Sequence, residues 1–180
     1  TDMGIGMRQG ALAALSLLVV CACVGVGIGM TQQLARTSQV AFVAKDVVAD
    51  ILPPPMYLIE TRLVLSQALE GSMDPNAARL EIDRLAAEYA DRVKHWQAHP
   101  PFGLESDLLG RQHAEGERFI AGARALVAAL VAGQVDAARR QLPALNTLYQ
   151  AHRDGVDRTV RSATRMAAAS MQDFDDTAAL

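Results

Sequence analysis

The stretch QVDAARRQLPALNTLYQAHRDGVDRTVRSATRMAAASMQDF, residues 134–174, decides the fold. Apolar and small side chains recur along it at alternating steps of three and four residues: Val135, Ala138, Leu142, Leu145, Tyr149, His152, Val156, Thr159, Ala163, Met166, Ser170 and Phe174. Such a seam is typical of a helix that packs in a bundle. We therefore expect one helix from about Gln134 to Phe174, with a kink at Pro143, because proline lacks the amide donor and crowds the preceding turn.

Two further one-sided helices precede it. The first follows GSMDPNA, residues 71–77, where Gly71 can end a helix, Asp74 can cap the next and Pro75 fits its first turn. It runs to about Ala98 and carries Ala78, Ile82, Leu85, Tyr89, Val93 and Trp96 on one face. After HPPFGLES, residues 99–106, Ser106 can cap a helix that ends before Gly133. That helix carries Leu109, Phe119, Ala123, Leu126 and Leu130.

The first helical segment, residues 31–70, differs from the others. Its forty residues would form a rod of about 60 Å. Its apolar side chains cover most of its circumference: Met56, Leu58, Ile59, Leu63, Val64, Leu65 and Leu69. A helix that is apolar on more than one face needs more than one neighbour, which suggests a homodimer contact besides the bundle core. Short connections make consecutive helices antiparallel, so we predict an all-α, up-down-up-down four-helix bundle.

Composition agrees with this fold and excludes some partners. Aromatic residues make up only 4% of the chain, and Ala, Leu and Val dominate, which favours helices over strands. The formal net charge is −3 and the signs are interspersed, so we expect no nucleic-acid partner. Cys21 and Cys23 are too close along a helix to pair comfortably, and no disulfide framework follows.

GALAALSLLVVCACVGVGIGM, residues 10–30, contains no charged residue and has the length of about 20 residues that a helix needs to cross hydrocarbon. The run is too long for the apolar core of a cleaved signal peptide, which is usually about 7 to 15 residues. Val19 and Val20 stand where a lipoprotein signal ending at Cys21 would have small residues. We therefore predict a transmembrane helix with Arg8 on the inner side.

DILPPPMYLIE, residues 50–60, places three prolines inside an otherwise helical segment. Pro53, Pro54 and Pro55 should bend or locally unwind it at a cost of about 3 kcal/mol or more. Two interpretations remain open. The break either frees the carbonyl groups of residues 49–51 for a ligand and gives the rod a place to flex, or lets the helix curve around its neighbours.

The chain resembles the extracytoplasmic sensor region of bacterial methyl-accepting chemotaxis proteins. The resemblance is carried by the N-terminal span, VVADILPPPMYLIETRLVLSQALEG (47–71), RLAAEYADRVKHWQ (84–97) and LYQAHRDGVDRTV (148–160). It covers nearly the whole chain, from about Gly10 to Phe174, and within the group the chain resembles the four-helix-bundle sensors with a proline-rich motif. It implies a cytoplasmic segment at 1–9, a membrane helix at 10–30, a periplasmic bundle at 31–174 and the approach to a second membrane helix at 175–180.

The resemblance also implies how the chain would work. A homodimer in the bacterial inner membrane would bind a small molecule in the periplasm and act on a chemotaxis histidine kinase and its coupling protein through a cytoplasmic part. Similar sensor regions occur on histidine kinases and diguanylate cyclases, so other outputs stay open. A third alternative is a structural bundle that docks a periplasmic binding protein.

Counting helical rise from the membrane-distal turns brings polar and aromatic residues to one level. They are Tyr57, Glu60, Tyr89, Arg92, Arg118, Tyr149, His152 and Arg153. All but Arg118 are candidate ligand-binding residues. Arginine suits carboxylates, glutamate suits an amine and aromatic rings form walls, so an amino acid or small organic acid fits best.

Each candidate also has a structural interpretation. Tyr149 and His152 lie on the seam and can be buried residues with satisfied tips. Arg92 and Arg153 can be solvated or paired at the surface. Glu60 stands among apolar neighbours and needs a partner, for which Arg153 is an alternative to a ligand.

The sequence predicts no metal, cofactor or enzymatic activity. His95 and His99 have the i, i+4 spacing of helical zinc ligands, but Pro100 disfavours helix at His99. The motifs of zinc hydrolases, phosphate-binding loops and nucleophile elbows are missing from the sequence.

Overall fold

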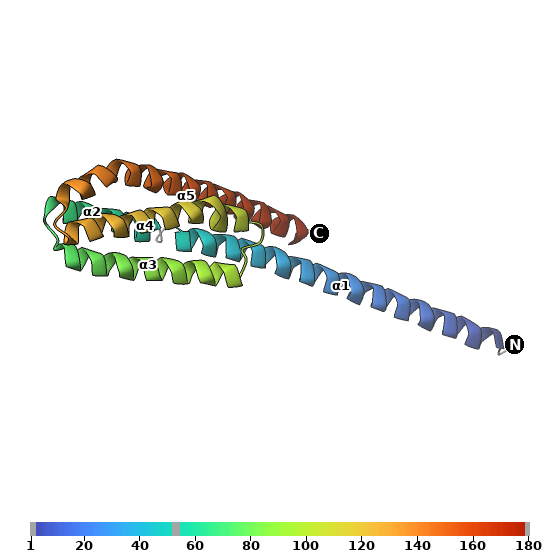
Figure 1. Cartoon of the computed structure of the whole chain (residues 1–180). Coiled ribbons are helices and arrows are strands. Elements are labelled where there is room, and N and C mark those ends of the chain that lie inside the picture. Colours follow the sequence, from blue (N-terminus) through green and yellow to red (C-terminus); the bar gives the residue numbers. More distant parts are fainter. Residues whose placement is uncertain (1–2, 52–54, 179–180) are drawn as a thin grey trace.

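The structure, a computed structural model, describes residues 3–51 and 55–178, with the side chains of residues 3–9, 11, 50, 51, 55–57 and 178 outside the description. All of its regular elements are helices (Figure 1). They are α1 (Met3–Ile51), α2 (Pro55–Glu70), α3 (Pro75–Ala98), a π-helical turn (Asp107–Arg111), α4 (Gln112–Val131) and α5 (Val135–Ala178).

The predicted all-α, up-down-up-down four-helix bundle is confirmed. The inner end of α1 together with α2 forms its first member, and α3, α4 and α5 are the other three. Figure 1 shows both chain ends at the same end of the bundle, with α1 projecting far beyond it. The distal end is formed by the α2–α3 and α4–α5 turns, where Gly71 (φ 80°) and Gly133 (φ 74°) adopt the left-handed conformation.

Two helices cover the first segment within the described residues. α1 continues from the apolar run as far as Ile51, and α2 is described from Pro55. Pro53 and Pro54 lie outside the described residues, so the two interpretations of the proline stretch both stay predictions.

The predicted caps hold at α3 and fail at α4. The Asp74 carboxylate accepts hydrogen bonds from the amides of Asn76 (2.9 Å) and Ala77 (3.1 Å), with Pro75 beginning the helix. Ser106, by contrast, is itself helical (φ −67°, ψ −33°) and makes no capping bond. The chain there passes through the π-helical turn, in which Gly110 leaves helical geometry (ψ −117°), before α4 starts. α5 is one helix through Pro143, and it extends to Ala178, four residues past the predicted end.

The bundle has two apolar cores, one above the other. The distal core includes Leu65, Ile82, Phe119 and Leu126, all nearly or fully buried, and Tyr149 packs against it. The proximal core, nearer the chain ends, consists of Val47, Trp96, Leu104, Leu108, Val156 and Ala163. Polar residues occupy the level between them.

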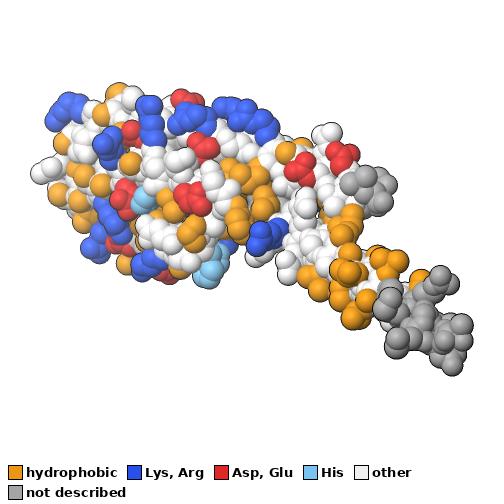
Figure 2. Space-filling view, turned by 90° about the vertical axis from the view of Figure 1, so that its right-hand side faces the viewer, with side chains coloured by type: hydrophobic (Ala, Val, Ile, Leu, Met, Phe, Trp, Pro, Cys, Tyr) orange, Lys and Arg blue, Asp and Glu red, His pale blue; other side chains and the backbone are white. Residues whose placement is uncertain are grey.

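Within the described residues, α1 is the one helix long and apolar enough to cross a membrane, in a window that reaches a mean hydropathy of 2.5. None of that window is buried against the rest of the chain. Figure 2 shows its hydrophobic side chains on the projecting arm, while charged side chains are spread over the bundle.

Candidate functional site

Five residues from three helices form a polar layer between the two cores. They are Tyr89 of α3, Gln112 and His113 of α4, and His152 and Thr159 of α5. His152 (1% exposed), Thr159 (0%) and Gln112 (6%) are buried. Buried polar groups of this kind are stable only when they are hydrogen-bonded.

Gln112 supplies most of those hydrogen bonds. Its main-chain oxygen accepts from His152 Nδ1 at 2.8 Å, and its side-chain Oε1 accepts from Thr159 Oγ1 at 2.6 Å. One residue at the start of α4 therefore fixes two positions of α5, two turns of helix apart.

Two glycines make room for these contacts. A Cβ atom on Gly155 would lie 2.8 Å from Gln112 Cα, so α4 and α5 can approach this closely only without a side chain there. A Cβ atom on Gly116 would lie 2.6 Å from Tyr89 Oη and 2.9 Å from His152 Nδ1. Both glycines stand inside helices, where glycine is unfavourable by about 1 kcal/mol relative to alanine, and the close packing offsets this cost.

Tyr89 and His113 join α3 to the layer. Tyr89 Oη lies 3.2 Å from His113 Nδ1, and the two rings stack with centroids 5.8 Å apart. The ring of Tyr89 also meets the edge of His152 at 6.3 Å. On the outer side, His113 Nε2 lies 3.6 Å from a carboxylate oxygen of the exposed Glu117.

Burial keeps His152 and Tyr89 uncharged. The pKa of His152 is lowered to about 4, mainly by desolvation and to a smaller extent by the nearby Arg153 and His113, while the hydrogen bond to Gln112 has the opposite effect. The pKa of Tyr89 is raised, mainly by burial and also by Glu117. At neutral pH both side chains are neutral, so these two residues act through hydrogen bonds and shape.

The structure brings together some of the sequence-predicted residues. Tyr89 and His152 meet in the polar layer, and Tyr149 stands next to it, its ring 5.5 Å from that of Phe119. Arg153 is half-buried and close enough to affect the His152 pKa, and Arg92 is also half-buried. The side chain of Tyr57 lies outside the described part. Arg118 is on the outer side of α4, 66% exposed and 3.2 Å from Glu115.

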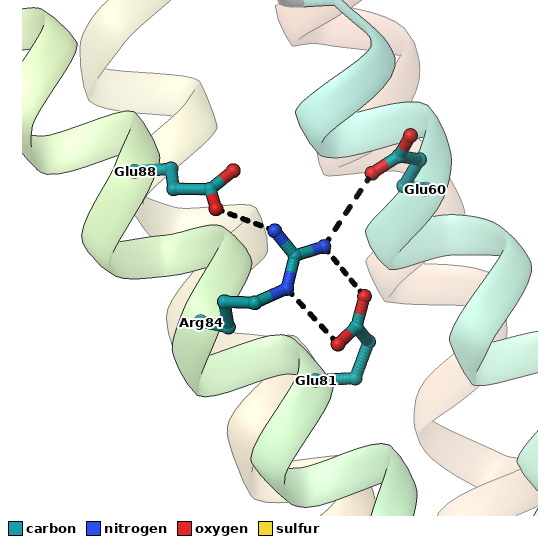
Figure 3. A network of polar contacts seen from close by, with 4 residues as sticks. All are labelled: Glu60, Glu81, Arg84 and Glu88. Carbon is teal, nitrogen blue, oxygen red and sulfur yellow. Dashed lines mark hydrogen bonds and ion pairs between the residues drawn. The ribbon is translucent and has the colours of Figure 1, made fainter.

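Glu60 lies elsewhere, in a surface ion-pair network between α2 and α3 (Figure 3). Arg84 binds both carboxylate oxygens of Glu81, at 2.6 Å and 3.1 Å, and also contacts Glu88. The third carboxylate near Arg84 is that of Glu60, whose Oε2 lies 4.0 Å from Arg84 Nη2. The partner of Glu60 is thus Arg84 rather than the Arg153 that the sequence suggested as an alternative to a ligand. Because all four side chains are about half exposed, solvent screens these charges.

Sequence reasoning missed Gln112, His113 and the two glycines. A signal for them exists in hindsight, because Gly116 and Gly155 interrupt alanine-rich helices next to polar residues. Thr159 was recognised as a seam position, and its polar hydroxyl on that seam is a second signal.

The described residues contain no group of three or more histidine, cysteine or acidic side chains that could hold a metal ion. The rings of His95 and His99 stack 4.7 Å apart, and His99 Nδ1 lies 3.0 Å from the main-chain oxygen of His95. That contact engages one ring nitrogen of His99 within the end of α3.

No protein-family model, curated protein sequence or solved structure matches this chain.

Proposed function

We propose that this chain is the sensor region of a membrane-anchored bacterial receptor, similar to the chemotaxis receptors that its motifs resemble. The bundle lies in the periplasm, α1 crosses the inner membrane, and a small polar metabolite is the signal. A cytoplasmic module, which in a chemotaxis receptor acts through a histidine kinase and a coupling protein, receives a displacement of the helices. The chain itself carries out no catalysis.

One observation carries this proposal: α5 belongs to both the polar layer and the pair of helices that leads out of the bundle. His152 and Thr159 hold it to Gln112, and its next turns pack against α1. Because a helix is stiff over this distance, a change in the polar layer would displace α5 as a unit relative to α1. A ligand produces such a shift only if it binds the two arrangements with different affinity.

The proposed ligand site lies at the edge of the polar layer, among Tyr89, Arg92, Tyr149 and Arg153. The half-buried arginines would bind a carboxylate, with tyrosine rings as walls. Because His152 is buried and already hydrogen-bonded to Gln112 of α4, its proposed role is to transmit ligand binding to that helix. Glu60, with Arg84 as its partner, is 40% exposed and would meet the amine of a ligand only from the α2–α3 surface.

A docking function is the second candidate, and a cleft at the distal end favours it. The open cleft has a volume of about 600 Å³ and is lined by residues that include Leu130, Val135, Glu70 and Arg139. Apolar and charged groups together suit a protein surface better than a single metabolite. In this case a periplasmic binding protein would bring the ligand.

A thermal-unfolding screen of the chain in lipid nanodiscs tests the direct sensor. Amino acids, organic acids, amines and purines are added in turn, and a ligand at 100 times its Kd should stabilise the folded state by about 2.7 kcal/mol. Arg153→Ala should abolish the stabilisation. Arg118→Ala is the matched control and should retain it, because Arg118 points outward and pairs with Glu115.

Two results would contradict a site at the polar layer. One is the absence of stabilisation by any compound with a chain that is fully helical. The other is a stabilising compound whose effect survives both Arg153→Ala and Arg92→Ala.

A further inference from the structure

An open groove lies between α1 and α5 at the end of the bundle where these two helices continue past α3 and α4 (Figure 1). We call it the proximal groove. Its lining comes from residues between 37 and 45 of α1 and between 170 and 175 of α5, and its volume is about 300 Å³. That volume is at the lower end of the range of small-molecule sites.

The proximal groove is separate from both the polar layer and the predicted membrane helix. Along α5, Ser170 of the groove lies about 25 Å of helical rise from Arg153 of the proposed metabolite site. Along α1, Thr37 lies about 10 Å beyond Met30, where the predicted membrane helix ends. In the proposed orientation the groove is therefore outside the hydrocarbon and open to water.

The proximal groove carries opposite charges at its two ends. Because α1 and α5 run antiparallel, Lys45 of α1 lies at the end toward the bundle and Asp175 of α5 at the outer end. Neither makes an ion pair with a described residue. From Thr37 to Lys45 the groove is about 12 Å long. It therefore suits a ligand whose own positive and negative groups are far apart.

Apolar side chains and one buried hydroxyl line the rest of the groove. Phe42 is 67% exposed and Met171 is 51% exposed, and both line it together with Phe174. Ser170 lines it too, yet its side chain is only 8% exposed and makes no hydrogen bond with a described residue. A buried hydroxyl of this kind favours a ligand that offers a hydrogen-bonding group.

We propose that the proximal groove binds a short apolar peptide with free termini. The peptide carboxylate lies at Lys45 and the peptide ammonium group at Asp175. An extended chain spans at most about 3.6 Å per residue, so about three residues match the length of the groove. The apolar side chains of the peptide pack against Phe42 and Met171, and a peptide group forms a hydrogen bond with Ser170.

The charges disfavour two other occupants. A single α-amino acid carries both of its charges at one end, so it cannot reach Lys45 and Asp175 together. The surface of a lipid bilayer is anionic, and Asp175 would repel it, as would Asp173 and Asp176 on the same helix.

A peptide in the proximal groove contacts both helices whose relative displacement is proposed above. If it binds two arrangements of α1 and α5 with different affinity, it also changes the affinity of the metabolite site, and the metabolite changes the affinity for the peptide by the same factor. This consequence rests on the proposed function, whereas binding of the peptide does not.

Calorimetric titration of the chain in lipid nanodiscs with the tripeptide alanyl-leucyl-alanine tests the site, with empty nanodiscs as the blank. Lys45→Gln and Asp175→Asn should each weaken binding about tenfold, because each removes a charged partner of one peptide terminus. Arg36→Gln and Asp173→Asn are the matched controls. They remove the same kinds of charge from the same helices outside the groove lining, and they should leave the affinity unchanged.

Capped peptides identify which terminus meets which residue. The N-acetylated peptide lacks the ammonium group, so it should bind about tenfold more weakly, and Asp175→Asn should cause no further loss. The C-terminally amidated peptide should behave in the same way toward Lys45→Gln. Additive losses in both combinations would overturn the proposal.

Two further results would also overturn it. One is a fully helical chain that does not bind the free tripeptide at millimolar concentration. The other is an unchanged affinity in Ser170→Ala, which removes the hydroxyl proposed to meet a peptide group and should weaken binding about fivefold. Circular dichroism checks that each variant folds. No residue of the polar layer is altered, so a failure of peptide binding is distinguishable from a failure of metabolite sensing.

Discussion

Gly116 leaves the space that the Tyr89 hydroxyl and the His152 ring occupy. Alanine favours a helix by about 1 kcal/mol over glycine, yet Gly116→Ala should lower the free energy of unfolding by about 1–3 kcal/mol because its methyl group overpacks the layer. Urea unfolding followed by circular dichroism measures this change.

A double-mutant cycle identifies the cause. Tyr89→Phe removes the oxygen that lies 2.6 Å from the new methyl group, so Gly116→Ala should cost less in that background. An identical cost in both backgrounds would mean that Tyr89 does not limit the space at Gly116.

His152 makes stability depend on pH. Its pKa is lowered from 6.5 to about 4 in the folded chain, so the unfolded chain takes up a proton first as the pH falls. Its contribution is therefore fully present above pH 6.5 and is lost between pH 6.5 and about 4, by about 1.4 kcal/mol per pH unit. His152→Asn keeps a donor for Gln112 but cannot titrate. The free energy of unfolding of the variant should fall less steeply over this range, and equal slopes would contradict the account.

The sequence predicted where Tyr89 and His152 lie more reliably than it predicted their partners. Helical rise is nearly constant, so counting residues placed these two at one level. The partner of a side chain also depends on how each helix is rotated about its axis. A small rotation decides whether Glu60 faces Arg153 or Arg84, and counting along the chain does not fix that rotation.

At the scale of the elements, the bond between Thr159 and Gln112 joins α5 to α4. Thr159→Val keeps the shape but leaves Gln112 Oε1 buried without its donor, so the free energy of unfolding should fall by about 1–3 kcal/mol. Thr147→Val is the matched control on the same helix. Thr147 is exposed and bonds only within α5, to Pro143 O, so its loss should change stability by less than about 0.5 kcal/mol. Equal effects would show that the layer contributes no special stability.

Helix boundaries were predictable where local chemistry sets them. Asp74, Pro75 and the two turn glycines act through their own backbone and nearest neighbours, and these predictions were confirmed. The π-helical turn was not predictable from local sequence. Its position depends on the packing of Leu104 and Leu108 in the proximal core, and no side chain caps it. For the same reason Ser106 was wrongly expected to begin a helix.

At the scale of the whole molecule, the seam of residues 134–174 and the short turns were sufficient to predict the four-helix bundle. The continuation of α1 and α5 past the other helices (Figure 1) was not foreseen, because it depends on where α3 and α4 stop relative to α1 and α5. Residues 31–70 carry apolar side chains over most of the helix circumference, and the bundle itself accounts for part of this because it buries Leu58, Val64 and Leu65. Ile59 (38%) and Leu63 (54%) stay exposed on α2.

The central claim is that binding at the bundle moves α5 relative to α1, and a distance measurement tests it most directly. Spin labels at Gln39 of α1 and Asp173 of α5, both exposed, are placed in a chain whose two native cysteines are replaced by alanine. Labelled chains are diluted with unlabelled ones in nanodiscs so that only distances within one chain are seen. The account predicts a shifted distance distribution when a stabilising compound from the screen saturates the chain. An unchanged distribution under saturation would contradict it.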